Sequence, residues 1–275
     1  MCTEIGCGYK NSDKPLPQAT DKQRRMFLKG LAALPLAVVL ADPKLAAAAG
    51  HKMPTVEVTL PDGSTATADI ALPATTEKAP TVLLIHEWWG LNDQIRAVAN
   101  ELAEQGYIAL AVDLYGGQYG GTPQEAMALM RALDPQRATN TLVAWVDWLR
   151  NHELSNGKVA TLGWCFGGGW SLNASLATSV DATVIYYGNV AKSAEELSSL
   201  NSPVLGHFGT LDKNINEEMV AGFEASLKAA GKSDYTLHWY EADHAFANPS
   251  GARYDEADAA LAWTRTTKFL ADHLS

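Results

Sequence analysis

The sequence predicts one α/β domain, in which a mostly parallel sheet carries helices on both faces and begins with an N-terminal β-hairpin. The first observation is that apolar runs alternate with amphipathic stretches along the chain. Runs that are apolar at every position indicate strands covered on both sides, as in parallel sheets between helices. The second is the turn sequence Pro61-Asp62-Gly63 between two short strand-like runs, which favours a hairpin. The third is the lack of an internal linker, so residues 50–275 are expected to form one domain.

Each expected element follows from its local pattern. Two alternating runs form the hairpin, and six continuous apolar runs form the remaining strands. Apolar residues at helical spacing predict the helices, the last of which closes the chain. The expected strands are 55–60, 65–72, 81–85, 107–112, 158–163, 182–187, 203–208 and 235–240. The expected helices are 94–105, 123–132, 136–151, 166–177, 217–230 and 255–273.

Residues 1–49 have the three parts of an export signal. Arg24-Arg25 opens a twin-arginine sequence, an apolar run covers 30–41, and a stretch of small residues ends at Ala49. We expect recognition by the twin-arginine export machinery, cleavage near Ala48 or Ala49, and a periplasmic or secreted enzyme. The alternative is an uncleaved signal that anchors the chain to the membrane. However, the run is about 12 residues long and contains Pro35, whereas a spanning helix needs about 20 residues.

Charge excludes two classes of partner. The chain has a net charge of −10, and residues 1–48 hold seven of its 21 Lys and Arg and four of its 31 Asp and Glu. Cleavage would leave 14 basic and 27 acidic residues, a net charge of −13. Such a domain repels phosphate backbones and anionic lipids, so we expect neither nucleic acid nor a membrane surface as partner. We expect a monomer that acts on a small molecule.

Cys165 is the candidate nucleophile. Cleavage would remove Cys2 and Cys7, so Cys165 would be the one cysteine left and could form no intramolecular disulfide. Gly163-Trp164-Cys165-Phe166-Gly167 follows a strand and opens a helix, which is the nucleophile elbow with cysteine in the serine position. The N-terminus of that helix favours a thiolate. The alternatives are a buried structural cysteine and a phosphate-binding glycine loop at 167–169, which lacks the required spacing.

Two downstream residues complete a possible triad. Asp212 follows the strand at 203–208, and His244 follows the strand at 235–240. The order nucleophile, acid, histidine is that of the α/β-hydrolases. Asp243 competes with Asp212 as the acid, but a residue adjacent to the histidine is badly placed to reach Nδ1.

Further motifs make a family resemblance specific. They are His86-Glu87-Trp88-Trp89-Gly90, Asp113-Leu114-Tyr115, Tyr186-Tyr187-Gly188, Gly209-Thr210-Leu211-Asp212 and His244-Ala245-Phe246, besides the elbow. Together they resemble the dienelactone hydrolase family over residues 56–274. The resemblance implies a single α/β-hydrolase domain that hydrolyses lactones or related esters without metal or cofactor.

The resemblance also implies a role for each matching residue. Cys165 is implied as nucleophile, His244 as base and Asp212 as the acid that orients it. Glu87 is implied as a buried switch that hydrogen-bonds the resting thiol and takes its proton when substrate enters. The backbone N–H groups of Trp88 and Phe166 are implied as the oxyanion hole, and Tyr186 is implied to line the pocket.

Other interpretations of the motif at 86–90 stay open. A Glu beside two tryptophans is expected to have a raised pKa, but Glu87 could instead bond nearby backbone N–H groups. Trp88 and Trp89 are expected to wall the pocket, or else to be ordinary packing. His86 is expected to be structural, because a zinc site made with Glu87 lacks a third ligand at useful spacing.

Asn248 marks a departure from the family pattern. Members that cleave dienelactone place an arginine there to hold the substrate carboxylate, and Pro123 falls near the second such arginine, with Arg131 and Arg137 not far away. An amide is a poor replacement for a bidentate arginine. We therefore expect a hydrolase that opens lactones or esters through an acyl-cysteine intermediate, with Asn248 at the substrate. The alternatives are a general carboxylesterase or thioesterase and a non-catalytic periplasmic binding protein.

Overall fold

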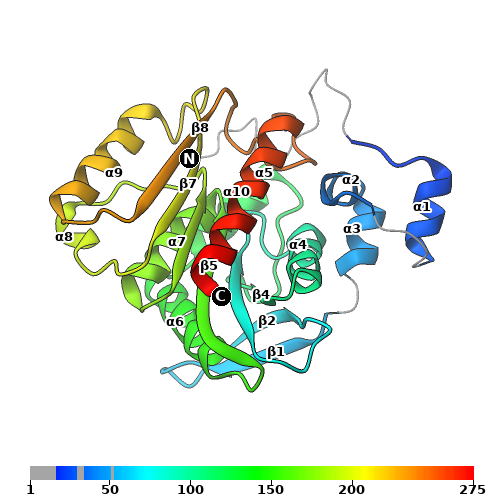
Figure 1. Ribbon diagram of the computed structural model, residues 1–275, viewed down its shortest axis with the longest axis horizontal. Coiled ribbons are helices and arrows are strands. Elements are labelled where there is room, and N and C mark those ends of the chain that lie inside the picture. Colours follow the sequence, from blue (N-terminus) through cyan, green and yellow to red (C-terminus); the bar gives the residue numbers. More distant parts are fainter. Residues whose placement is uncertain (1–16, 30–33, 51–52) are drawn as a thin grey trace.

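The protein, described here from a computed structural model, contains one eight-stranded sheet (Figure 1). The structure describes residues 17–29, 34–50 and 53–275. The strand order is β1-β2-β4-β3-β5-β6-β7-β8. β1 pairs with β2 and β2 with β4 in antiparallel fashion, whereas every later pair is parallel. The carboxyl ends of β3 and β5–β8 therefore meet at one edge of the sheet.

The strands and helices have these bounds. The strands are β1 Thr55–Thr59, β2 Thr65–Ala71, β3 Ala79–Ile85, β4 Ile108–Val112, β5 Ser155–Trp164, β6 Ala182–Tyr186, β7 Val204–Gly209 and β8 Tyr235–Tyr240. The helices are α1 Asp21–Leu28, α2 Leu36–Ala41, α3 Pro43–Gly50, α4 Asp93–Glu104, α5 Pro123–Ala132, α6 Pro135–Asn151, α7 Phe166–Ala177, α8 Ala194–Leu197, α9 Glu217–Ala229 and α10 Glu256–Leu274.

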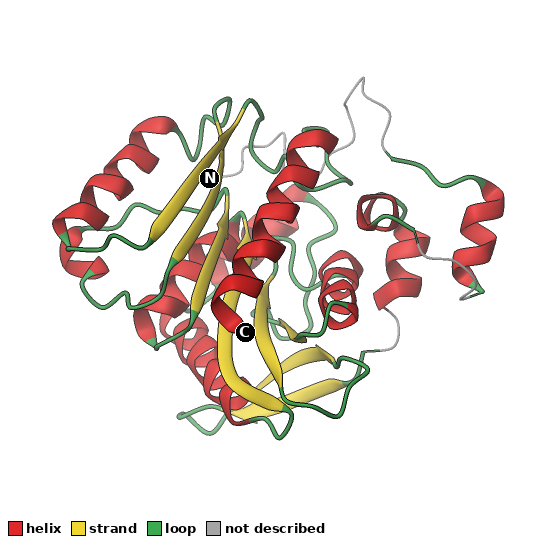
Figure 2. Cartoon of the chain, viewed as in Figure 1, coloured by secondary structure: helices red, strands yellow, loops and turns green. Residues whose placement is uncertain are grey.

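Helices cover both faces of the sheet (Figure 2). Alternation along β3 decides the faces, because Val82 and Leu84 pack with α4 and α10 whereas Leu83 and Ile85 pack with α6. A third apolar cluster joins α7, α8 and α9 to the β6–β7 end of the sheet. The predicted fold class, with its N-terminal hairpin and mostly parallel sheet, is confirmed.

Five elements differ from the expectations. α1, α2 and α3 are helices within the expected export signal, where no helix was predicted. α8 was not predicted, because its four residues hold too little periodicity; it begins at a capping box between Ser193 and Glu196. β5 begins three residues before the predicted strand, and Ser155 pairs with Ala79 across an irregularity in the register. The other strand and helix boundaries agree within two residues.

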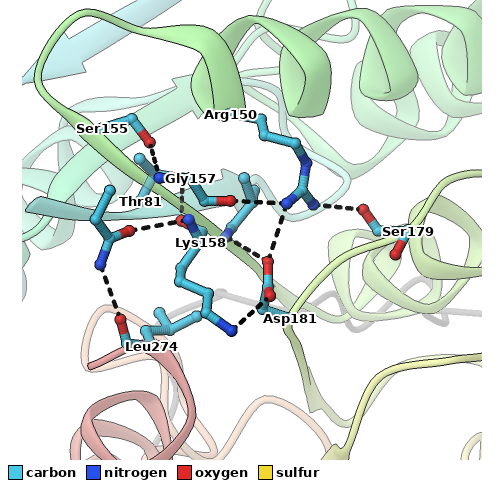
Figure 3. Close-up of polar contacts among 10 residues, drawn as sticks. Thr81, Arg150, Ser155, Gly157, Lys158, Ser179, Asp181 and Leu274 are labelled. Atoms are coloured by element: carbon cyan, nitrogen blue, oxygen red, sulfur yellow. Dashed lines mark hydrogen bonds and ion pairs between the residues drawn. The ribbon is translucent and has the colours of Figure 1, made fainter.

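A polar cluster around Asp181 ties the amino end of β5 to its neighbours (Figure 3). The carboxylate accepts hydrogen bonds from the backbone N–H of Val159 at 2.9 Å and from Arg150 at 3.3 Å, and pairs with Lys158 at 3.1 Å. Arg150 also donates to the carbonyls of Gly157 and Ser179, both at 2.7 Å. This cluster lies at the opposite end of β5 from Cys165 and fixes the strand that carries it.

α2 and α3 pack beside α4, and α1 packs against α3 (Figure 1). Leu40 and Leu45 belong to the same apolar cluster as α4 and α10. Arg24 of α1 pairs with Asp42 at 2.6 Å. Among the residues that the structure describes, no helix is both long and apolar enough to cross a bilayer.

Candidate active site

Cys165 sits on a strained turn between β5 and α7. Its φ of 54° and ψ of −115° lie outside the regions favoured by side-chain-bearing residues. The turn needs both flanking glycines, because a Cβ at Gly163 would lie 2.0 Å from the carbonyl oxygen of Gly167. A Cβ at Gly167 would lie 2.1 Å from the carbonyl oxygen of Ile85, where β3 ends. The elbow is thus held in direct contact with the loop that carries Glu87 and Trp88.

Asp212 and His244 reach the same place from the next strand ends. The two loops are joined at their base, since Leu211 N–H donates to the carbonyl of Ala242 at 3.0 Å. A Cβ at Gly209 would lie 2.2 Å from that same oxygen, so only glycine allows this approach. The tight contact brings two residues 32 positions apart into hydrogen-bonding distance.

The three side chains form a continuous relay. Nδ1 of His244 lies 2.6 Å from Oδ2 of Asp212, and Nε2 lies 3.2 Å from Sγ of Cys165. Burial acts to raise the pKa of Asp212, but hydrogen bonds from His244 and from the N–H groups of Ile215 and Asn214 hold it below its ordinary value. An ionised carboxylate only accepts, so Nδ1 carries the proton and the lone pair of Nε2 faces the thiol.

The competing residues have other partners. Asp243 accepts a hydrogen bond from the backbone N–H of His244 at 2.6 Å and lies 4.0 Å from Arg253. His86 is fully buried: its Nδ1 lies 2.6 Å from the carbonyl oxygen of Glu87, and its Nε2 accepts from the N–H of Leu114 at 3.2 Å. Both ring nitrogens of His86 thus stabilise backbone, as expected for a structural histidine.

Burial and the N-terminus of α7 act in opposite directions on the thiol. Burial raises the pKa of Cys165 far above its ordinary value, and the charge of Glu87 raises it further. The N–H of Phe166 at the start of α7 lowers it, as expected, but this single dipole is weaker than desolvation. Cys165 is therefore a neutral thiol at neutral pH, and it needs a base.

Glu87 is held by Asn248. Asn248 Nδ2 donates to Oε2 of Glu87 at 2.6 Å, while Oε1 has no hydrogen-bond partner among the described residues. Burial raises the pKa of Glu87 to about 7, although Asn248 and the charge of Arg253 act to lower it. The resemblance implied a Glu87–thiol hydrogen bond at rest; in this structure the carboxylate bonds the amide of Asn248, and the thiol pairs with His244.

A cavity of about 350 Å³ adjoins this group. Glu87, Tyr186 and Asn248 line it, whereas Cys165 and His244 are not among the described lining residues. Trp88 and Trp89 are not among the lining residues; their rings pack against each other at 4.9 Å inside the core, so their side chains are packing residues here. The Trp88 indole N–H has no hydrogen-bond partner among the described residues.

The comparisons assign the family. The model of the dienelactone hydrolase family matches residues 67–274 of this chain. The chain belongs to the dienelactone hydrolase family. This hydrolase is 30% identical over 226 residues to carboxymethylenebutenolidase 1 of Cupriavidus pinatubonensis, a match that covers 78% of this chain and 95% of that enzyme. It is 33% identical over 225 residues to the carboxymethylenebutenolidase of Pseudomonas putida, with 76% and 92% of the chains covered.

A solved structure agrees with the fold. The crystal structure of a putative dienelactone hydrolase from Klebsiella pneumoniae superposes with a TM-score of 0.71 and 26% identity, covering 80% of this hydrolase and 98% of that chain. The family match begins inside β2, so α1–α3 and β1 lie outside it.

Two groups of residues at this site were missed by sequence reasoning. Tyr187 lines the cavity, packs edge-on against His244 at 5.2 Å between ring centroids, and has a positive φ of 37°. Its place in Tyr186-Tyr187-Gly188 could have drawn attention to it. The other group comes from α2 and α10. α2 falls within the expected export signal, and the pattern of the predicted helix 255–273 does not show that one side of it lines the site.

Proposed function

We propose that this hydrolase opens neutral lactones or esters through an acyl-cysteine intermediate on Cys165. The observation that carries the proposal is the relay Asp212–His244–Cys165, with separations of 2.6 and 3.2 Å. It supplies a nucleophile, a base of fixed tautomer and an ionised group that stabilises the imidazolium.

The first half-reaction transfers the acyl group to sulfur. Nε2 of His244 takes the thiol proton as Sγ attacks the carbonyl carbon, whose oxygen becomes an oxyanion. The N–H groups of Phe166 and Trp88 are the donors we assign to that oxyanion, supported by the direct contact between the elbow and the loop after β3. When the carbon–oxygen bond breaks, the imidazolium returns the proton to the leaving alkoxide.

The second half-reaction restores the enzyme. Water attacks the thioester while His244 takes one of its protons, and the acid leaves as the proton returns to sulfur. Glu87 is the group that tunes this cycle: its charge raises the pKa of Cys165, and its own pKa of about 7 lets it accept a proton near neutral pH. A protonated Glu87 no longer opposes thiolate formation, so proton uptake there favours attack.

Substrate charge follows from the lining of the cavity. Among the described residues that line the cavity, the ionisable groups are the carboxylates of Glu87 and Glu256 and three tyrosines, with no lysine, arginine or histidine. Asn248, at the position of the family's arginine, is already bonded to Glu87. A free substrate carboxylate would gain no cationic partner from this lining, and a neutral acyl or alcohol group fits better.

Replacing the nucleophile tests the proposal against the binding-protein alternative. Cys165→Ala should lower kcat for a chromogenic aryl ester by about 10³-fold or more. Iodoacetamide should label Cys165 and abolish activity in proportion to the labelling. Full activity in Cys165→Ala or in protein labelled at Cys165 would refute the assignment, and absence of wild-type turnover on a broad ester and lactone panel would favour a binding role.

We also propose export by the twin-arginine route to the periplasm or beyond. The support is the sequence Arg24-Arg25-Met26-Phe27-Leu28-Lys29 with its apolar run and small residues behind it. This route carries folded proteins, which suits a chain in which residues 34–50 pack on the folded domain.

A further inference from the structure

Residues 34–50 pack against the rest of the domain more extensively than recognition of an export signal requires. Val39, Leu40, Leu45 and Ala46 are buried, and the first three belong to the main apolar cluster. Apolar burial of this kind stabilises the packing of the segment on the domain. An export signal that is only recognised by a receptor requires none of this packing.

Side chains of α4 also bind the backbone of this segment. Gln94 Nε2 donates to the carbonyl oxygen of Leu40 at 2.7 Å, and Asn100 Nδ2 donates to that of Ala49. These carbonyls belong to the last turns of α2 and α3, where helices leave acceptors unpaired. A Cβ at Gly50 would lie 2.8 Å from Cβ of Arg96, so α3 ends in close contact with α4.

α2 forms one wall of the cavity at the candidate active site. Leu36, Ala37 and Leu40 line it from α2, and Ala259 and Trp263 line it from α10. Glu87, Asn248 and Tyr187 of the strand-end loops line it as well, so the same cavity touches both residues 34–50 and the loops beside the catalytic relay. Figure 1 shows α2 and α3 beside α4, with α10 crossing the face of the sheet.

We propose that α2 completes an apolar substrate-binding pocket, in which Leu36, Ala37 and Leu40 receive an uncharged acyl or alkyl group of the substrate. The inference rests on the proposed esterase function and adds that this apolar group of the substrate determines which esters the enzyme prefers. A cavity of about 350 Å³ is at the small end of ligand pockets, which suits a medium-sized apolar group. Residues 35–40 then determine specificity, and removal of the segment by cleavage near Ala48 would take this wall away.

Filling the cavity from either wall tests the proposal in the full chain, with residues 1–275 confirmed by intact mass. Ala37→Trp fills it from α2 and Ala259→Trp from α10, so that one variant remains informative if the other misfolds. Ala48→Trp is the matched control, since Ala48 is exposed on α3 and is absent from the lining. Circular dichroism and Tm identify variants that fold.

Two measurements are made on each variant. The first is the ratio of kcat/KM for long and short substrates, with p-nitrophenyl hexanoate against acetate for the acid side and hexyl against methyl acetate for the alcohol side. The second is the Kd of the apolar fluorophore N-phenyl-1-naphthylamine. In Ala37→Trp and Ala259→Trp we expect one of the two ratios to fall, and the Kd to rise, by about tenfold or more. Ala48→Trp should stay within about twofold of wild type.

Unchanged ratios in both series would overturn the proposal, even if the fluorophore bound more weakly. An unchanged Kd in folded Ala37→Trp and Ala259→Trp would overturn it as well. Failure of the wild-type chain to hydrolyse any ester would instead refute the proposed function, and the fluorophore would still report whether α2 walls an apolar pocket.

Discussion

Glu87 places a carboxyl group in surroundings that favour its neutral form. Burial raises the pKa of Glu87 from 4.5 to about 7, because the hydrogen bond from Asn248 and the charge of Arg253 only partly offset it. Between these values the folded chain binds a proton that the unfolded chain lacks. The free energy of unfolding therefore falls as pH rises through this window, and the loss is complete above pH 7.

Glu87→Gln should remove that loss. A shift of this size corresponds to about 3 kcal/mol, so the difference in unfolding free energy between Glu87→Gln and wild type should move by that amount in favour of the variant from pH 4 to pH 8. Urea unfolding at several pH values measures it. Glu104→Gln, exposed on α4, is the control. If the unfolding free energies of wild type and Glu87→Gln changed equally with pH, folding would not raise the pKa of Glu87, and this account would be contradicted.

Asn248 has a second role besides the predicted contact with substrate. It occupies the position of a substrate-binding arginine, and its amide holds Glu87, a partner 161 residues away. The position could be predicted from its spacing to His244. The contact could not, because it depends on how two strand-end loops meet.

Asn248→Arg should shift selectivity toward anionic substrates. A charge-assisted hydrogen bond contributes about 1.5–3 kcal/mol, so kcat/KM for a carboxylated lactone relative to its methyl ester should rise about ten- to a hundredfold. Asn201→Arg, at an exposed position, should leave the ratio unchanged. A wild-type preference of tenfold or more for the acid would contradict the account and would indicate a cation such as Arg253, whose charge already lowers the pKa of Glu87.

The strand β5 connects stability at one end to chemistry at the other. Asp181 anchors its amino end through Arg150, Lys158 and the N–H of Val159 (Figure 3). Its side chain is 21% exposed, so these charges are only partly screened by water. Sequence patterns predicted the strand, but not this cluster, whose members are brought together by the turn before β6.

Asp181→Asn should lower the free energy of unfolding by about 1–3 kcal/mol. The amide can still accept from Val159, so the change isolates the lost charge next to Arg150 and Lys158. Asp272→Asn breaks an exposed pair with Lys268 and should cost less than about 1 kcal/mol. Equal effects in urea unfolding would mean that the Asp181 cluster contributes no more than a surface pair.

The apolar run near the N-terminus is typical of an export signal and also packs on the domain, and the spacing of its apolar residues does not distinguish the two. A short apolar stretch followed by alanines predicts an export signal, and the same residues form the buried sides of α2 and α3. Nothing in the local sequence indicates that this stretch packs on α4. That information lies in the apolar residues of α4, which would be exposed without it.

At the scale of the whole molecule, the targeting prediction rests on the sequence alone. Arg24→Lys plus Arg25→Lys should leave the full-length precursor in the cytoplasm, as measured by fractionation and immunoblotting. Lysine keeps the positive charge that pairs with Asp42, so a loss of export would report the motif rather than the fold. Lys22→Arg, which precedes the pair, should be exported normally. Native, uncut protein found mainly in the cytoplasm would contradict this part of the account.

The positions of the strands, the mostly parallel sheet and the three residues of the relay could be predicted because apolar runs and strand-end positions are local signals. The size of the opposing effects on the pKa of Cys165 could not, since a helix N-terminus favours thiolate and only the packed structure reveals the larger effect of burial. Trp88 and Trp89 show the same limit: large aromatic residues in a loop suit a pocket wall or a core equally well, and here they pack in the core.

Trapping the intermediate tests the central claim most directly. The full chain is mixed with p-nitrophenyl trimethylacetate, whose bulky acyl group slows hydrolysis of the thioester, and the reaction is quenched in acid during the burst of p-nitrophenol. Digestion and mass spectrometry then locate the acyl group. The account predicts one trimethylacetyl group on the peptide that contains Cys165, in an amount equal to the burst, and none on that peptide from Cys165→Ala. A burst with the acyl group on another residue, or steady turnover by Cys165→Ala at the wild-type rate, would contradict it.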